Sequence, residues 1–292
     1  AANLSNIAPT VKRKVEAQMS ELFTSVEDLA ERIPDGAKVA LAPDYSGCSM
    51  VTARALIARG AKDLHLIGVP SVGFQGDMLI GAGCVETLEP APATLDEYGP
   101  APRFMAAAKA GSIKVIDGTC PAIHAGLQAA EKGIPCMPGR GIVGSDLLNH
   151  RDDWTTGTDP FGEQDGPLVL VKAIQPDVTL IHVPLADRNG NAWIGVRREM
   201  MVMAHAARET FVTADEIYDG DLLADEQLAP GTIPGLYVSA VSQAANGAWP
   251  VGLFGRYGPD DAHLRDYLER ARTDEGFASY LDEFVYAPKA AE

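Results

Sequence analysis

The sequence alternates short apolar runs typical of β-strands with segments whose apolar residues recur at helical spacing. The expected strands lie at residues 38–42, 64–69, 85–88 and 113–116, and the expected helices at residues 50–59, 76–83, 104–110 and 123–132. Strands separated by helices of about ten residues pair in parallel through crossover connections. The sequence therefore predicts an α/β fold with an open, mainly parallel sheet and flanking helices.

The alternation breaks between residues 137 and 167, a stretch rich in Gly, Asp, Thr and Pro. It is too long to be a simple connection, so we expect a functional loop or a hinge there. After it come expected strands at residues 168–172, 178–183 and 210–213, a hairpin at residues 187–194, a helix at 199–207, a loop-rich part at 219–250, and helices at 261–272 and 275–284.

The N-terminal region has its own helical pattern. Apolar residues step by three and four from Val11 to Ile33, and Ser25 with Asp28 resembles a capping box that begins a new helix. We therefore expect residues 1–24 to form an N-terminal helical extension and residues 25–292 to form a single α/β domain.

Charge and hydropathy argue against several classes of partner. The net charge is −16, and no Lys/Arg-rich run is present to neutralise nucleic-acid phosphates or anionic lipid. No apolar run approaches the roughly 20 residues that span a bilayer, and residues 1–25 lack the pattern of a signal peptide. We expect a cytoplasmic protein that binds neither nucleic acid nor membrane.

Metal and common cofactor motifs are weak or missing in the sequence. The six histidines are not spaced as metal ligands and the four cysteines form no close pair, so no metal site is expected. The run Gly139–Gly144 matches a dinucleotide-binding spacing, but Pro135 and Pro138 deny the preceding segment a central strand position. No P-loop or serine-hydrolase elbow occurs, and no permanently bound cofactor is expected.

Three turns rich in glycine and serine follow expected strands, at residues 43–47, 70–76 and 139–145. In an open parallel sheet such turns gather at the carboxyl ends of the strands, where backbone N–H groups can hold carboxylate, phosphate or thioester oxygens. Ordinary tight turns explain each one singly but not all three together. The candidate binding residues are Tyr45, Ser46, Gly47, Ser71, Gly73, Phe74, Gln75, Gly144 and Ser145.

Several segments, in order along the chain, resemble the α subunit of family I CoA-transferases, especially the glutaconate CoA-transferase type. They are residues 76–81, 128–135, 144–147, 176–182 with 187–191, 212–217 with 233–235, and 238–241 with 246–250. The resemblance covers residues 23 to 286 and implies a fold of the CoA-transferase and sugar-phosphate-isomerase kind.

The resemblance also implies a partner and a reaction. Such enzymes assemble α and β subunits into a heterodimer or a dimer of heterodimers, and the acyl-CoA thioester is attacked by a glutamate of the β subunit. An anhydride and an enzyme-bound CoA thioester follow, and CoA passes to a free carboxylic acid. The Ser-Glu-Asn-Gly-like stretch that carries this glutamate is absent from the sequence. We therefore expect this chain alone to be inactive, with coenzyme A as a substrate.

The same resemblance suggests roles for single residues. Arg140 and Arg188 are candidates for the CoA phosphates, with solvated arginines as the alternative. Tyr45 and Trp249 stand where related subunits have a Gly-Gly-Phe-like turn and a histidine, which favours a bulkier or more apolar acyl group than glutaconate; ordinary packing is the alternative.

Asp117 follows the expected strand at residues 113–116, and the position is acidic in many related α subunits. A carboxylate there is a candidate general base in hydrolases of the same fold, and a turn with a helix cap at residues 117–119 is the structural alternative. Three functions therefore stay open: a CoA-transferase subunit, a subunit of a ring-cleaving CoA-thioester hydrolase, and a non-catalytic binding subunit.

Overall fold

The computed structural model describes residues 22–163 and 165–287. The expected helical extension at residues 1–24 falls almost wholly outside this range. The first helix after it, α2 (Val26–Glu31), begins where the sequence predicts, because the Ser25 hydroxyl accepts a hydrogen bond from the Asp28 backbone N–H at 3.0 Å. Serine at this position satisfies an N–H group that the helix itself leaves free.

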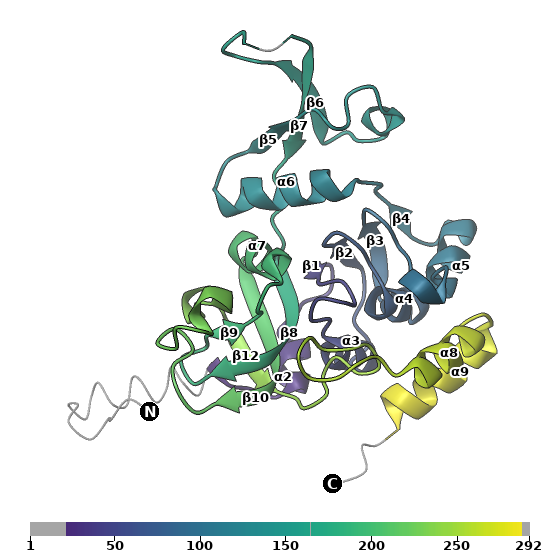
Figure 1. Cartoon of the computed structure of the whole chain (residues 1–292). Helices are drawn as coiled ribbons and strands as arrows, with labels where there is room; N and C mark the ends of the chain where they lie inside the picture. Colours follow the sequence, from purple (N-terminus) through teal and green to yellow (C-terminus); the bar gives the residue numbers. More distant parts are fainter. Residues whose placement is uncertain (1–21, 164, 288–292) are drawn as a thin grey trace.

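A nine-stranded sheet forms the centre of the described part of the chain (Figure 1). Seven strands run parallel in the order β12-β10-β8-β1-β2-β3-β4, and β9 and β11 extend β8 as antiparallel strands. The parallel strands are β1 (Lys38–Leu41), β2 (Leu64–Gly68), β3 (Val85–Glu89), β4 (Lys114–Val115), β8 (Val178–Asp187), β10 (Glu209–Tyr218) and β12 (Ala240–Gln243). The antiparallel ones are β9 (Ala192–Trp193) and β11 (Thr232–Ile233). The α/β class and the parallel sheet predicted from the sequence are confirmed.

Helices cover both faces of this sheet. Val39 and Leu41 of β1 belong to the core shared with α2, α3 (Met50–Ala58), α4 (Phe74–Gly81), α8 (Asp261–Arg270) and α9 (Asp274–Leu281). Ala40 and Ala42 point to the other core, which contains residues of α6 (Cys120–Glu131) and α7 (Arg198–Ala206). Successive strand side chains alternate between faces, so a strand buried on both faces reads as a continuous apolar run. A further helix, α5 (Pro102–Ala110), packs beside α4.

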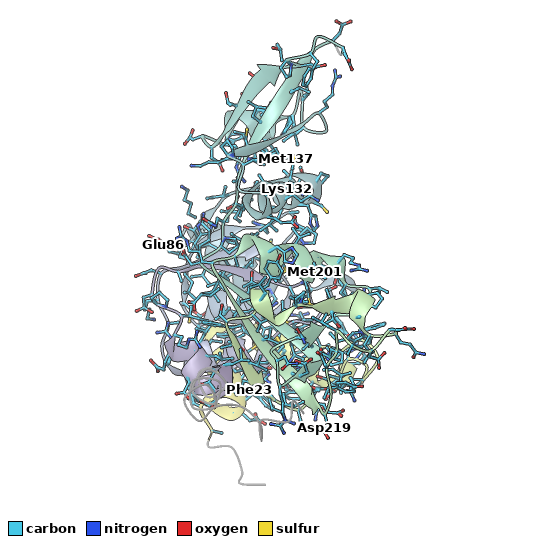
Figure 2. The ribbon with its side chains drawn as sticks, turned by 90° about the vertical axis from the view of Figure 1, so that its left-hand side faces the viewer. Phe23, Glu86, Lys132, Met137, Met201 and Asp219 are labelled. Carbon is cyan, nitrogen blue, oxygen red and sulfur yellow. The ribbon has the colours of Figure 1, made fainter. Side chains whose placement is uncertain are left out.

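The stretch at residues 137–167 differs from the irregular segment expected. It contains β5 (Cys136–Gly139) and β6 (Trp154–Thr158), which pair antiparallel on either side of β7 (Pro167–Lys172). This small sheet projects from the body beyond α6 (Figure 1), and Figure 2 shows Met137 at its base next to Lys132 at the end of α6. Trp154, Val169 and Val171 form its own apolar core against Ala122 of α6. A single domain for residues 25–292 remains a prediction.

Arg151 joins the small sheet to the main one. Its side chain is almost fully buried and donates to Glu89 Oε1 at 2.7 Å, to the carbonyl oxygen of Asp117 at 3.0 Å, and to both carboxylate oxygens of Asp153. Glu89 is the last residue of β3, so these contacts of Arg151 lie at the carboxyl ends of β3 and β4.

In the part of the chain that the structure describes, no helix has both the length and the apolar character needed to cross a membrane.

Candidate functional site

The strand order places a natural crevice at the end of β1. The chain builds β2, β3 and β4 on one side of β1 and then returns to build β8, β10 and β12 on the other side. In open α/β sheets, ligands bind outside the carboxyl ends of the strands at such a reversal of strand order. The turn at residues 43–49, which follows β1, therefore occupies the position where a binding site is most expected.

This turn is fixed against β8 by a glycine that no other residue can replace without strain. Gly47 has a φ of +83°, and its carbonyl oxygen accepts a hydrogen bond from the His182 backbone N–H at 2.8 Å. A Cβ atom on Gly47 would lie 2.3 Å from the carbonyl oxygen of His182. The neighbouring Ser46 hydroxyl donates to Glu199 of α7. The turn is thus held by β8 and α7 together.

The turn after β2 is joined to the turn after β1. The Phe74 backbone N–H donates to Asp44 Oδ2 at 3.0 Å, and the Gln75 side-chain amide donates to the carbonyl oxygen of Ala42. A Cβ atom on Gly73 would lie 2.0 Å from Asp44 Oδ2, so glycine permits this close approach. Two of the three predicted turns therefore form one continuous wall.

A cavity of about 380 Å³ opens beside this wall. Most of its lining is apolar or aromatic, and its charged lining residues are Asp44, Asp96, Glu97 and Arg197. The aromatic lining residues are Tyr45, Phe74, Tyr98, Phe254 and Tyr257. A mostly apolar pocket with a few polar groups is the usual form of a small-molecule site.

Asp44 has an unusual electrostatic environment. Burial raises its pKa to about 7, against the opposing effect of the hydrogen bond from the Phe74 N–H, and the nearby carboxylates of Asp96 and Asp77 raise the pKa further. Its Oδ1 is buried and has no hydrogen-bond partner among the residues described. The raised pKa means that Asp44 is partly protonated near neutral pH.

Arg197 lies in the segment that leads into α7. The carbon at the centre of its guanidinium group is 5.8 Å from the centroid of the Tyr45 ring and 5.5 Å from that of Phe254. Cation–π contacts of this kind hold a planar guanidinium in one orientation. Arg197 is the arginine of the cavity lining, and it comes from a different part of the chain than Asp44.

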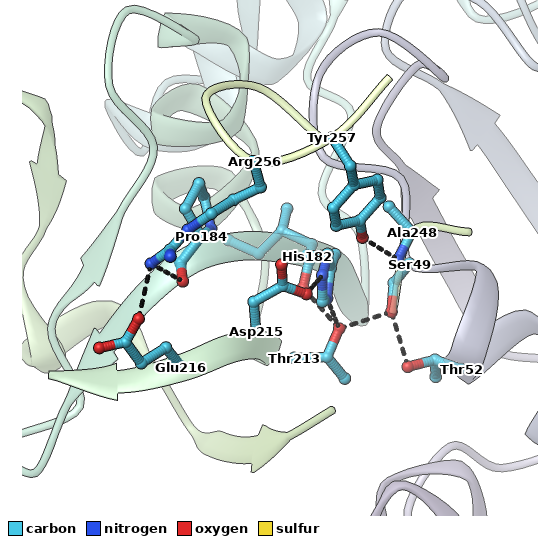
Figure 3. A network of polar contacts seen from close by, with 11 residues as sticks. Ser49, Thr52, His182, Pro184, Thr213, Asp215, Glu216, Ala248, Arg256 and Tyr257 are labelled. Carbon is cyan, nitrogen blue, oxygen red and sulfur yellow. Dashed lines mark hydrogen bonds and ion pairs between the residues drawn. The ribbon is translucent and has the colours of Figure 1, made fainter. Parts of the chain in front are cut away.

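A buried polar network lies behind the crevice (Figure 3). The His182 ring is within 3.0 Å of Asp215 Oδ1 and 2.8 Å of Thr213 Oγ1, and Thr213 in turn contacts Ser49, which contacts Thr52. Ser49 contacts Thr213 rather than His182, and both Ser49 and His182 are buried. The network is therefore not a serine-hydrolase triad; it locks the start of α3 to β8 and β10.

A second, larger and more open groove of about 1500 Å³ adjoins the cavity, and Tyr257 and Pro259 line both. Trp249 and Arg188 belong to its lining. The Trp249 indole donates to Asp260 Oδ2 at 3.1 Å, and Arg54 donates to the carbonyl oxygen of Trp249 at 2.9 Å. Two residues singled out from the sequence thus lie in the groove next to the cavity rather than in the cavity itself.

The predicted binding residues separate into groups. Tyr45 and Phe74 line the cavity, whereas the turn residues behind them shape the wall. These turn residues are Ser46, Gly47, Ser71, Gly73 and Gln75, and none of them belongs to the cavity lining.

The third turn, at residues 139–145, does not follow a strand of the parallel sheet. It belongs to the small antiparallel sheet, because β5 pairs with β7. Ser145 caps a helical turn by accepting from the Leu147 N–H at 3.2 Å, Gly144 precedes it with a φ of +79°, and Arg140 donates to the carbonyl oxygen of Asp165. The expected convergence of all three turns at one sheet edge is therefore not found. Ligand contacts by Arg140, Gly144 and Ser145 stay predictions.

Asp117 is exposed and lies outside the lining of the cavity and the groove. The cap of α6 is Thr119, whose hydroxyl accepts from the Ala122 N–H at 3.3 Å. The main-chain oxygen of Asp117, rather than its carboxylate, receives the hydrogen bond from Arg151. A general-base role for Asp117 stays a prediction.

Sequence reasoning missed the charged and aromatic lining residues Asp44, Asp96, Glu97, Tyr98, Arg197, Phe254 and Tyr257. A signal for Asp44 was present, since it is a carboxylate placed directly after a buried strand. The others come from remote segments without a local motif. Within the part of the chain that the structure describes, no group of three or more His, Cys, Asp and Glu residues is arranged to hold a metal ion.

Comparison with known proteins gives a consistent result. A family model described as coenzyme A transferase matches residues 23–244. The A subunit of 3-oxoadipate CoA-transferase from Pseudomonas knackmussii is 31% identical, over 93% of this chain and 95% of that protein. The A subunit of glutaconate CoA-transferase from Acidaminococcus fermentans is 29% identical, over 92% of this chain and 88% of that protein. An uncharacterized protein from Archaeoglobus fulgidus is 31% identical over 94% of this chain, which spans only 62% of that protein's length.

Solved structures agree with these relatives. The crystal structure of glutaconate coenzyme A-transferase from Acidaminococcus fermentans superposes with a TM-score of 0.84 and 25% identity, covering 91% of this chain and 89% of that one. The decarboxylase AibA/AibB superposes with a TM-score of 0.79 and 28% identity, covering 89% of this chain and 98% of that one. The fold and the resemblance expected from the sequence are confirmed.

Proposed function

Because this chain belongs to the coenzyme A transferase family, we propose that it is the α subunit of a heteromeric CoA-transferase that moves CoA between an acyl-CoA and a free carboxylic acid. The cavity at the end of β1, next to a wide open groove, is the observation that carries this proposal. The cavity provides a site for an acyl group, and the groove beside it provides space for the much larger CoA part of an acyl-CoA.

The attacking carboxylate belongs, in this proposal, to a glutamate of a β subunit, since the chain itself lacks a Ser-Glu-Asn-Gly-like stretch. The glutamate attacks the thioester carbonyl and releases the CoA thiolate, which leaves an acyl-glutamyl anhydride. The thiolate then attacks the glutamyl carbonyl and releases the first acid. The second acid reverses these two steps, so that a new acyl-CoA forms and the glutamate is regenerated. Each acyl transfer is thereby divided into easier steps.

The α chain contributes the binding surface for this chemistry. Tyr45 and Phe74 pack against the acyl group, and the wall that Asp44 makes with Phe74 holds it beside the incoming glutamate. Arg188 in the adjoining groove is available to a CoA phosphate.

The assembly is a heterodimer or a dimer of heterodimers in this proposal. Tyr45 and Phe254 at the cavity are substantially exposed in the single chain, and so is Val196 beside Arg197, which agrees with a surface that a partner protein covers. A cytoplasmic location belongs to the same proposal. The four cysteines of the chain form no disulfide, as is usual for proteins of a reducing compartment.

The test is to measure CoA exchange with the chain alone, with its β partner alone, and with the two combined. Acyl-CoA is supplied with acetate as acceptor, and acetyl-CoA is quantified by chromatography. We expect exchange only from the combined subunits, and a Glu→Gln change in the partner's Ser-Glu-Asn-Gly-like stretch should abolish it. Exchange by this chain alone would disprove the division of roles between the two subunits.

The same assay without acetate separates the remaining alternatives. Release of free CoA from the acyl-CoA at a rate that acetate does not change would indicate a thioester hydrolase. Acyl-CoA binding without either reaction, and without a partner, would indicate a binding subunit.

A further inference from the structure

Arg197 is held in the wall of the cavity, and the described part of the chain offers it no counter-ion. Two aromatic rings, those of Tyr45 and Phe254, flank its guanidinium group. The Nε atom is buried and has no hydrogen-bond partner, and no ion pair between residues of the ranges 22–163 and 165–287 includes Arg197. Arg197 as a whole is only partly buried, but its Nε–H is shielded from water, and a buried donor without an acceptor is unfavourable. The arrangement is therefore better suited to a bound ligand than to the empty chain.

The nearby carboxyl groups do not supply that anion. Burial raises the pKa of Asp44 to about 7, so this group carries only part of a negative charge at neutral pH. Asp96 and Glu97 also line the cavity but are exposed, where water and salt weaken their attraction for Arg197. Glu199 accepts a hydrogen bond from Ser46. Among residues 22–163 and 165–287 no carboxylate forms an ion pair with Arg197, so a bound anion can serve as its partner.

The rest of the cavity indicates what carries that anion. A volume of about 380 Å³ exceeds what an acetyl group needs and falls near the lower end of ligand pockets, which run from about 300 to 1,000 Å³. Phe74, Leu95 and Leu264 give it apolar walls. A ligand that satisfies both features has an apolar chain or ring with one anionic group.

We propose that the cavity holds the acyl part of the thioester and that Arg197 selects acyl groups whose far end carries a second carboxylate. This inference rests on the proposed function, because it assigns the cavity to the acyl-CoA. The planar guanidinium fork matches a carboxylate in a bidentate manner, which a point charge does not. Tyr45 and Phe254 keep the fork in place before the substrate arrives. Arg197 is thus a specificity residue, separate from the attacking glutamate.

The experiment compares acyl-CoA pairs that differ only in the second carboxylate, using the complex of this chain with its β partner, and with acetate as acceptor. One pair is adipoyl-CoA and hexanoyl-CoA, and the other is 3-(4-carboxyphenyl)propanoyl-CoA and 3-phenylpropanoyl-CoA. For the wild-type complex we expect kcat/KM to be at least about tenfold higher for the carboxylated member, given the usual strength of hydrogen bonds to charged groups. Arg197→Met should lower that value by about ten- to a hundredfold and leave the neutral member almost unchanged.

Arg198 provides the matched control, since it is the neighbouring arginine, is exposed, and lies outside the cavity lining. Arg198→Met should keep the wild-type preference. Equal losses on both members of a pair in Arg197→Met would place Arg197 on CoA or on the β partner and overturn the inference. A wild-type ratio near one would overturn it as well, while the proposed transferase function would stand.

Binding measurements keep the inference testable if the complex transfers no CoA, which would be the failure of the proposed function. Calorimetry of adipoyl-CoA and hexanoyl-CoA on the same complex reports on the cavity without turnover. Tighter binding of adipoyl-CoA that Arg197→Met removes would support the role of Arg197. Equal affinities, or no binding of either thioester, would refute it.

Discussion

The backbone N–H of Phe74 donates to the Asp44 carboxylate at 3.0 Å, and this single hydrogen bond joins the turn after β1 to the turn after β2. Phe74 is also the first residue of α4, so the bond satisfies one of the N–H groups that a helix leaves free at its start. Asp44 therefore holds the two turns together and also belongs to the cavity lining.

Replacing Asp44 separates these two roles. In Asp44→Ala the Phe74 N–H loses its acceptor inside the protein, and an unsatisfied buried donor costs about 1–3 kcal/mol. Asp44→Asn keeps an acceptor oxygen and should lose less than half as much. Urea unfolding of both variants measures the difference. Equal destabilisation by Ala and Asn would show that the hydrogen bond does not hold the two turns together.

The raised pKa of Asp44 predicts how stability depends on pH. Burial raises the pKa in the folded chain to about 7 from the usual 3.8, so folding favours the protonated form. The stabilising contribution of this group is complete below about pH 4 and is lost as pH rises through 7. Wild type should therefore lose stability relative to Asp44→Asn between pH 5 and 8, as measured by urea unfolding at each pH. Parallel pH profiles of the two proteins would contradict the shift.

Arg151 predicts how firmly the small sheet is attached. Burial tends to raise the pKa of Glu89, but the hydrogen bond from His65 and the charge of Arg151 outweigh it and hold that pKa below its usual range. Arg151→Met leaves a buried carboxylate without its main cation, which costs about 3–5 kcal/mol. We expect lower stability in urea and earlier proteolytic cleavage within residues 136–172.

The matched control for this prediction is Arg272→Met. Arg272 pairs with Glu269 on the surface, with both side chains mostly exposed, and such pairs contribute about 0–1 kcal/mol. A loss in Arg151→Met no larger than that in Arg272→Met would mean that the buried pair does not anchor the small sheet.

Asp117 offers a direct test between transferase and hydrolase chemistry. Because its side chain is exposed and outside both cavity linings, Asp117→Asn should leave transferase turnover of the complex within about tenfold of wild type. A general base contributes about a hundredfold or more. A hundredfold loss, measured as CoA release from acyl-CoA without an acceptor, would instead assign Asp117 to the hydrolysis of the thioester.

The sequence predicts the parallel sheet well because its strands are buried on both faces. The run at residues 39–42 is apolar throughout, and the run at residues 64–69 is interrupted only by the partly buried His65, which leaves little ambiguity about strand or loop. The strand β6, with the sequence Trp-Thr-Thr-Gly-Thr, has no such run, since most of its residues are partly or fully exposed. Its place is set by pairing with β7, a contact that local patterns do not encode.

Some residues of the candidate site can likewise be predicted from the sequence, and others cannot. Tyr45 and Phe74 follow strands that are neighbours in the sheet, so the general rule for carboxyl ends brings them together. Arg197 and Phe254 enter the same cavity from segments that are distant along the chain. Their positions depend on how α7 and the loop before α8 pack, which only the folded structure shows.

Gly47 and Gly36 provide a pair of glycines for measuring how tightly the turn after β1 is fixed. Both have a positive φ, +83° and +76°, so alanine at either position carries the left-handed strain of about 1–2 kcal/mol. A Cβ atom on Gly36 meets nothing within 4 Å, whereas one on Gly47 would lie 2.3 Å from the His182 carbonyl oxygen in the middle of the sheet. That oxygen cannot retreat without disrupting β8, so Gly47→Ala should lose about 3 kcal/mol or more and most of the transferase activity. Gly36→Ala should lose only the backbone strain and keep its activity; similar unfolding free energies for the two variants would show that β8 yields at His182 and that the turn is not rigidly held.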